Sequence, residues 1–168
     1  MPSTRHSRLT NESSRRTFVA YQDAEGAEIF NEELAECMKH SMFVNRDGTW
    51  VKRPVEPLVL NQRRAKYKRL IQDIEDGKPI RKANKQGAKP VRRQPALWEL
   101  WQTWESNTPL RIYYGEPNER LEVVVAFLAH IKDISCDSKT IAEVQDDRMD
   151  CAGERCEELF ARRGWTSN

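Results

Sequence analysis

The most regular pattern of apolar and polar positions in this chain runs from residue 58 to residue 76. Its apolar residues return every three or four positions, and Lys or Arg fills many of the positions between them. This period is typical of an amphipathic helix, and Gly77 followed by Pro79 is a common way for a helix to end. The pattern therefore predicts a helix over 58–76 with an apolar stripe on one side and cations elsewhere. The stripe consists of Leu60, Tyr67, Leu70, Ile71 and Ile74.

A second helix is predicted over 32–42. Asn31 stands where a helix cap is favoured, and two glutamates follow in the first turn, where negative charge suits the helix dipole. Apolar residues recur there at four-residue spacing. They are Phe30, Leu34, Met38 and Met42.

Two short hairpins are predicted in the same half of the chain. Residues 17–22 are rich in aromatic and β-branched side chains, and a glycine-bearing turn separates them from the apolar residues of 27–30. Further on, Asp47 and Gly48 form a turn signal between two apolar pairs. That arrangement predicts a second hairpin over 43–51.

A helix is also predicted for the segment that begins at Pro95, because Leu97, Trp101 and Trp104 share one helical face. These three side chains already fill an inward stripe, so Trp98 beside them is not needed for the core. Large aromatic side chains are enriched at interface hot spots. Trp98 is therefore our candidate for contact with a protein partner, and burial of the whole tryptophan run is the alternative.

The rest of the C-terminal half combines a strand with helices. Residues 110–114 (LRIYY) predict a strand. The apolar run over 121–131 fits the buried face of a helix or a core strand, and its period does not decide between them. A helix is expected to open near residue 137, and a further helical run ends at Arg163. Gly153 either separates two helices or lies within one.

Together these elements predict an α+β fold: a helix-dominated small domain with one or two short N-terminal β-hairpins and a Trp-rich helical C-terminal half. The expected divisions are a flexible polar tail over 1–15, an α+β half over 16–77, a basic linker or arm over 78–94, and a mainly helical half over 95–168. The chain has 168 residues, enough for one ordinary domain.

Charge is distributed very unevenly along the chain. Of its 28 Lys and Arg residues, fifteen lie between Arg46 and Arg93, together with five acidic residues, which gives that segment a net charge of +10. The residues before it carry −2 and those after it carry −6, so the whole-chain value of +2 conceals a cationic middle. Such an asymmetry suggests a polyanion as partner.

Eleven cations in this middle segment are candidates for contact with nucleic-acid phosphates, because Lys and Arg release condensed counterions when they bind them. The alternative is that they form a solvated helix face and linker, offset by acids of the same chain or of a neighbouring copy. The candidates are Arg63, Arg64, Lys66, Lys68, Arg69, Arg81, Lys82, Lys85, Lys89, Arg92 and Arg93.

Motifs for catalysis or cofactor binding are not found in the sequence: it has no glycine-rich phosphate loop, no HExxH, no GxSxG and no CxxC. Cys37-x-x-His40 and Cys151-x4-Cys156 approach zinc-ligand spacings but lack a properly spaced mate, so we expect no metal and no cofactor. No apolar run approaches the roughly 20 residues of a membrane span. The first 15 residues lack the apolar core of a secretory signal, so we expect a reducing, cytoplasmic or other intracellular compartment.

These observations favour a non-enzymatic subunit that binds RNA or DNA through its basic middle and also contacts protein, or a further copy of itself, as in a nucleoprotein or virion assembly. Because no base-reading motif is recognisable, the binding is expected to be salt-sensitive and not sequence-specific. The alternative is a small phage- or plasmid-type inhibitor or adaptor that occludes a host protein. Its basic segment would then dock on an acidic protein surface.

Overall fold

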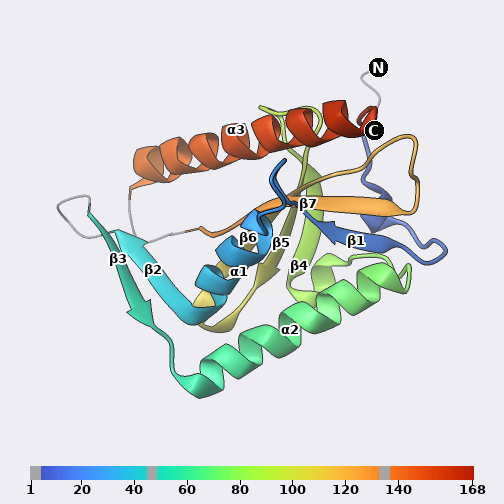
Figure 1. Cartoon of the computed structure of the whole chain (residues 1–168). Coiled ribbons are helices and arrows are strands. Elements are labelled where there is room, and N and C mark those ends of the chain that lie inside the picture. Colours follow the sequence, from blue (N-terminus) through green and yellow to red (C-terminus); the bar gives the residue numbers. More distant parts are fainter. Residues whose placement is uncertain (1–4, 45–48, 133–136) are drawn as a thin grey trace.

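The computed structural model describes residues 5–44, 49–132 and 137–168 and confirms the α+β class. A five-stranded mixed sheet forms the centre, and a separate two-stranded antiparallel ladder projects beyond the main body (Figure 1). The sheet strands are β1 (Thr17–Ala20), β4 (Gln86–Pro90), β5 (Trp98–Thr103), β6 (Pro109–Gly115) and β7 (Val123–Ile131); the ladder strands are β2 (His40–Val44) and β3 (Trp50–Pro54). The α-helices are α1 (Ile29–Lys39), α2 (Pro57–Glu75) and α3 (Ser138–Arg163).

The sheet order is β1-β7-β6-β5-β4, so the first strand of the chain lies beside the last. Strands β4 to β7 pair as an antiparallel meander, and β1 joins them in parallel with β7, with Thr17 opposite Val123. All nine residues of β7 are buried, which explains its continuous apolar sequence. The N-terminal and C-terminal halves of the chain therefore share one sheet and one core.

Helices cover the central sheet on both sides (Figure 1). The C-terminal half of α3 packs on one face, where the rings of Phe127 and Phe160 meet edge to face at 5.9 Å. On the other face, the Gln102 amide donates to the backbone carbonyl of Lys66 in α2 at 3.3 Å. α1 lies along β7, where Glu33 accepts a hydrogen bond from the backbone N–H of Ala129. The sheet is thus the middle layer between α3 and α2.

The helix predicted over 58–76 is confirmed, with Pro57 at its start and Gly77 just after its end. Gly77 has a φ of +75°, and a Cβ there would lie 2.1 Å from the backbone oxygen of Ser13, so only glycine fits. The earlier helix runs from Ile29 to Lys39 and not over 32–42, because the residues after it turn into strand β2.

Of the two predicted hairpins, the second is confirmed and the first is wrong. β2 and β3 pair antiparallel with Val44 opposite Trp50. The Asp47-Gly48 turn that prompted this prediction lies outside the described residues. Residues 17–20 do form a strand, but it pairs with β7, and the expected return strand at 27–30 is instead the start of α1.

The helix predicted after Pro95 is wrong, because this segment forms β5, an interior strand of the sheet. The C-terminal half is therefore not a bundle of Trp-rich helices, but three sheet strands followed by one long helix. β6 confirms the strand predicted at 110–114, and the open alternative at 121–131 is settled as a strand, β7.

The segment 78–94 is not an exposed arm throughout, because residues 86–90 form the edge strand β4. Gly87 lies opposite Trp101, and a Cβ on Gly87 would come within 2.7 Å of the indole ring. The expected flexible tail also differs from the structure, since Leu9 is completely buried. Both segments are held by tertiary contacts that cannot be predicted from their local sequence.

α3 is a single helix that passes through Gly153. The side chain of Asp137 caps its first turn by accepting from the backbone N–H groups of Lys139 and Thr140, as the sequence predicted for this region. A Cβ at Gly153 would lie 2.5 Å from the Gln94 side chain, so glycine here allows the β4–β5 connection to pack against the helix. None of the helices in the described ranges is both long enough and apolar enough to cross a membrane.

Candidate nucleic-acid interface

α2 carries its cations on two different flanks. Its buried side is formed by Arg63, Leu70 and Ile74. Because successive helical residues are about 100° apart, positions 66 and 69 fall on one flank of that buried side and positions 64 and 68 fall on the other. The basic helix predicted from the sequence is therefore not one uniform cationic surface.

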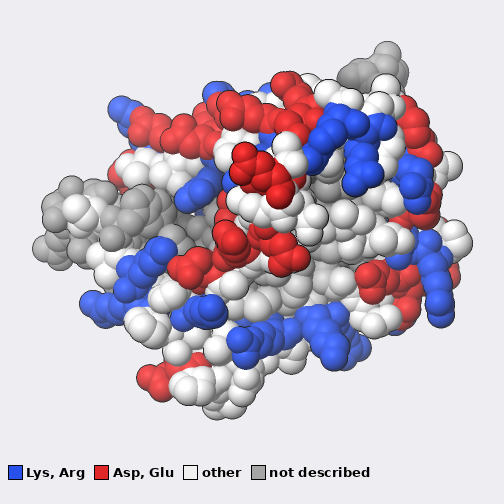
Figure 2. All heavy atoms as spheres, viewed as in Figure 1, with Lys and Arg blue, Asp and Glu red and all other residues white. Residues whose placement is uncertain are grey.

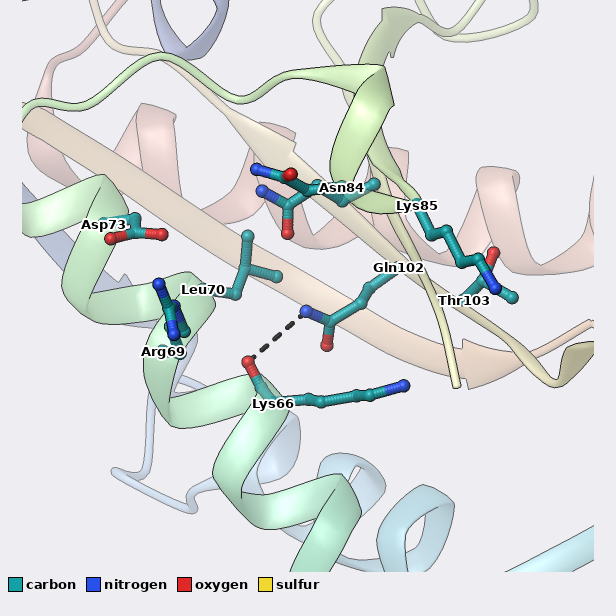
Figure 3. A pocket seen from close by; sticks show the side chains of 9 residues that line it. Lys66, Arg69, Leu70, Asp73, Asn84, Lys85, Gln102 and Thr103 are labelled. Atoms are coloured by element: carbon teal, nitrogen blue, oxygen red, sulfur yellow. Dashed lines mark hydrogen bonds between the residues drawn. The ribbon is translucent and has the colours of Figure 1, made fainter. Parts of the chain in front are cut away.

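A polar hollow of about 250 Å³ lies between α2 and the ends of β4 and β5. Lys66 and Arg69 line it from α2, and Lys85 lines it from the turn that enters β4 (Figure 3). Lys85 has a φ of +55°, in the left-handed region, at the end of the short 3-10 helix η2 (Lys82–Asn84). Residues from both predicted basic elements thus meet at one place, which we call the α2–β4 pocket. Its lining residues are Lys66, Arg69, Leu70, Asp73, Asn84, Lys85, Gln86, Gln102 and Thr103.

The cations of the α2–β4 pocket are available to a ligand. Within the described part of the chain, no carboxylate lies within ion-pair distance of Lys66, Arg69 or Lys85. Asp73 is the one acid of the lining, and the Lys78 ammonium pairs with it at 2.9 Å. The pocket therefore presents three positive charges and a carboxylate that is already neutralised.

Gln102 links α2 to the sheet by a hydrogen bond. Its side-chain amide donates to the Lys66 carbonyl, and its carbonyl oxygen accepts from the indole N–H of Trp104 at 2.9 Å. Both polar ends of this buried side chain are thus used, and Lys66 is held over β5. Gln102 is a positioning residue of the pocket wall.

Gln86 lies directly opposite Gln102 in the β4–β5 ladder, but its side chain is not hydrogen-bonded in the same way. Cross-strand partners point to the same face of a sheet, so Gln86 also faces α2. Only 7% of Gln86 is exposed, and no described residue hydrogen-bonds its carboxamide, whose N and O atoms are not fully buried and line the hollow. The neutral amides of this pocket were not found from the sequence, since single Asn and Gln residues carry no recognisable pattern.

Arg63 is not available for phosphate contact. Its side chain is completely buried and donates to the backbone carbonyls of Cys37 at 2.8 Å and His40 at 3.0 Å. The remaining nitrogens bind the carboxylate of Glu105, and the guanidinium lies over the Trp104 ring. This predicted contact is wrong: Arg63 ties α2 to the end of α1 and to the β5–β6 connection.

Two further candidates already have acidic partners. Arg93 binds Asp150 of α3 through two hydrogen bonds of 2.7 Å, and Asp146 lies 3.5 Å away. The hydrogen bonds and charge of Arg93 lower the pKa of the Asp150 carboxyl to about 2. Lys89 lies 3.4 Å from the buried carboxylate of Glu99.

The other candidate cations are exposed and lie outside the pocket. They are Arg64, Lys68, Arg81, Lys82 and Arg92.

Trp98, the predicted partner contact, is only 1% exposed. It lies in β5 opposite Tyr114 and belongs to the core on the sheet face toward α2. In this structure its ring offers no surface to a partner. Trp101 is the half-buried member of the run, and it lies over Gly87 on the opposite face.

A second group of charged residues lies on the sheet face toward α3. The Arg111 guanidinium lies 3.2 Å from Glu99, and the rings of Tyr113 and His130 stack at 5.5 Å. Burial, followed by the positive charge of Arg148, lowers the pKa of His130 to about 3, so its imidazole is neutral near pH 7. Across the described ranges, no three His, Cys, Asp or Glu side chains gather as a metal site would require.

The surface charge follows the same division. On the face drawn in Figure 2, acidic side chains gather over α3 and basic side chains gather over α2. Most acids of α3 lie in its first two-thirds, where Asp146 and Asp150 hold Arg93. The basic side chains therefore gather on the α2 side of the sheet and the acidic ones on the α3 side.

Comparison with protein-family models, with curated proteins and with solved structures yields no match for this chain. The fold and the pocket define the class of protein: an α+β domain in which three cations without an acidic partner among the described residues converge between a helix and a sheet edge.

Proposed function

We propose that this protein is a non-enzymatic nucleic-acid-binding subunit that contacts phosphates at the α2–β4 pocket and also contacts protein. The observation that carries the proposal is the convergence of Lys66, Arg69 and Lys85 on one hollow, with no described acid paired to any of them. Phosphates attract such cations because binding releases counterions from the nucleic acid. The exposed Arg81 and Lys82, just before Lys85, extend the positive surface.

Rigidity supports this assignment of roles. Lys66 and Arg69 stand on a helix of nineteen residues that is fixed to the sheet, and Lys85 is held by the backbone turn into β4. Cations on a fixed scaffold lose less conformational freedom on binding than those on a loop. Arg93 contributes less, because a phosphate must first displace Asp150 from it.

The protein-contact part of the proposal concerns the acidic surface of α3. Its exposed acids include Glu143, Asp147 and Glu154, and α3 lies on the side of the sheet opposite α2 and the pocket (Figure 1). This separation lets a basic protein surface bind α3 while nucleic acid occupies the α2 side.

The test compares the two flanks of α2. The variant Lys66→Ala/Arg69→Ala removes two pocket cations, and the matched control Arg64→Ala/Lys68→Ala removes two exposed cations from the opposite flank of the same helix. Binding of a short fluorescent single strand is measured by anisotropy between about 50 and 200 mM salt. We expect the pocket variant to lower the salt slope by about 1.4, at about 0.7 for each lost phosphate contact, and the control to lower it by less.

Three results would contradict the proposal. Absence of binding by the wild-type protein at low salt would remove it and leave the adaptor alternative, in which the basic surface meets an acidic protein. Equal effects of the two variants would show that the pocket has no special part in binding. Shortened RNA products after incubation with the protein would overturn the non-enzymatic part.

A further inference from the structure

We infer that the α2–β4 pocket is a subsite for one unpaired nucleotide, in which the cations hold the phosphate and the Gln86 carboxamide pairs with the edge of the base. This inference rests on the proposed function and makes it more specific. It follows from an amide that lines the hollow without a hydrogen-bond partner in the described protein, from the size of the hollow and from the placement of the cations around it.

The first step is the state of Gln86. A carboxamide has two N–H donors and a carbonyl acceptor, and where it lines a hollow without a protein partner these groups are open to water or to a ligand. Gln86 is more than nine-tenths buried, lines the pocket and has no partner among the described residues. Gln102, directly opposite, has both of its polar ends satisfied. Both glutamines line the hollow, but only the Gln86 amide is left without a protein partner and is therefore free to bind a ligand there.

The second step is the chemistry that an amide recognises. A carboxamide presents a donor beside an acceptor, which matches the donor–acceptor pairs on the edges of nucleobases, adenine above all. A phosphate offers acceptors only, so it would leave the carbonyl oxygen of Gln86 unpaired. The Gln86 amide therefore matches the hydrogen-bonding edge of a nucleobase. The phosphate of the same nucleotide would contact the cations Lys66, Arg69 and Lys85.

The third step is size. The hollow of about 250 Å³ is smaller than the roughly 300–1,000 Å³ typical of sites for drug-sized ligands. A single flat base with its sugar and phosphate at the rim fits this scale, and a base pair does not. Since a base inside a duplex is stacked and paired, occupation requires a single strand or a nucleotide turned out of the helix.

Asn84 and Thr103 complete the polar lining on the sheet side of the pocket, as Figure 3 shows. Their amide and hydroxyl groups are suited to a ribose hydroxyl or to a second atom of the base. Asp73 lies on the α2 side, and its charge is balanced by Lys78, so it does not repel the phosphate strongly.

The experiment uses two small competitors that differ by the base. Adenosine 5′-monophosphate and ribose 5-phosphate carry the same phosphate and sugar, and each is titrated against the complex of the full chain with a labelled single strand. We expect the nucleotide to compete about three- to tenfold better, as one or two neutral hydrogen bonds would give. In the nuclear magnetic resonance spectrum, the side-chain amide signals of Gln86 should shift with the nucleotide and not with ribose 5-phosphate.

The variant Gln86→Met keeps the length of the side chain and removes its hydrogen bonding. It should abolish the difference between the two competitors, and Gln86→Leu should do the same. The matched control is Gln22→Met, because Gln22 is an exposed amide beside Arg162 and Arg163 at a separate hollow. The control should keep the wild-type difference.

The outcomes separate the two proposals. If the wild-type protein binds no labelled strand at about 50 mM salt, the proposed function itself fails. If it binds the strand but both competitors act equally, or if the Gln86 signals stay unchanged, the nucleotide subsite is refuted and backbone binding stands. The spectrum of the wild-type protein decides this even if a Gln86 variant fails to fold.

Discussion

Replacement of Arg63 by alanine should destabilise this protein far more than replacement of Arg64, although the two arginines are adjacent in a helix that reads as uniformly basic. Arg63 is buried and binds Glu105 and two backbone carbonyls, whereas Arg64 is exposed. The contrast tests whether the structure separates structural cations from binding cations correctly.

The magnitude follows from the groups that Arg63 leaves behind. The buried carbonyls of Cys37 and His40 lose their donor, at about 1–3 kcal/mol for each unsatisfied group. Breaking a buried ion pair costs about 3–5 kcal/mol, but the Glu105 side chain is 29% exposed, so water compensates part of its charge. We therefore expect Arg63→Ala to lower the free energy of unfolding by about 3–4 kcal/mol, and Arg64→Ala to change it by less than about 0.5 kcal/mol.

Urea denaturation followed by circular dichroism measures both values. With a denaturant slope of about 2 kcal/mol per molar, the Arg63 variant should unfold at a urea concentration about 1.5–2 M lower than the wild type. A double-mutant cycle with Glu105→Ala should give a coupling energy above about 1 kcal/mol. A loss below about 1 kcal/mol, similar to that of the Arg64 variant, would refute the structural role and return Arg63 to the candidate phosphate contacts.

Two further results are expected from the burial of the tryptophans and from the Arg93–Asp150 pair. Trp98→Ala and Trp104→Ala should each cost about 3–5 kcal/mol in thermal melts, and Trp101→Ala should cost less than about 2 kcal/mol because its ring is half-buried; equal losses would contradict the placement of β5. Arg93 lowers the pKa of Asp150 from 3.8 to about 2, so the stabilisation is complete above pH 4 and is lost as the pH falls toward 2. Asp150→Asn should remove this part of the acid dependence of the unfolding free energy, and an unchanged acid profile would show that the pair is not formed in solution.

The sequence predicts an element well where local preference and tertiary contacts agree. α2 has an apolar period, a proline at its start and a glycine just after its end, and the sheet accepts the same apolar stripe that the period indicates. The strand at 110–114 and the ladder of β2 and β3 likewise combine strand-forming residues with nearby turn signals. In each case the deciding interactions lie within a few residues of one another.

The tryptophan segment shows how this reasoning fails. Apolar residues are so dense over 97–104 that they satisfy a helical period and a strand alternation equally. The strand is selected by partners: β5 pairs with β6 across a connection in which Ser106 and Asn107 adopt positive φ values. A turn between two aromatic-rich segments was the available indication of a hairpin, and it outweighs periodicity in so short a run.

β4 could not be predicted from its own residues, since Gln-Gly-Ala-Lys-Pro has little strand preference. Its position at the sheet edge tolerates Pro90, and the Trp101 ring occupies the space that a side chain at Gly87 would need. The strand exists because β5 offers it a partner. Such long-range selection is invisible in a local window of sequence.

The candidate site was predicted in kind but not in detail. Charge counting identified the basic middle segment, from which Lys66, Arg69 and Lys85 reach the pocket. The sequence could also have shown that Arg63 is not a phosphate contact. Arg63 stands three residues after Leu60 and four before Tyr67, so it lies on the apolar stripe of the helix. The amide side chains of the pocket could not be predicted from the sequence, since their position depends on how β4 and β5 pair.

The structure divides a charge excess that looks continuous in the sequence. Arg63 is neutralised by Glu105, Arg93 by Asp150 and Lys89 by Glu99, so each of these cations would have to lose an acidic partner before it bound a phosphate. The pocket cations have no such competitor among the described acids, and their field is not cancelled locally. Because the acids of α3 lie beyond the sheet, the proposed polyanion would approach the pocket from the side away from them, where the one acid of the lining, Asp73, is paired with Lys78. Net charge per segment therefore overstates the surface that we propose for binding, which rests on the three cations that have no described acidic partner and also line the pocket.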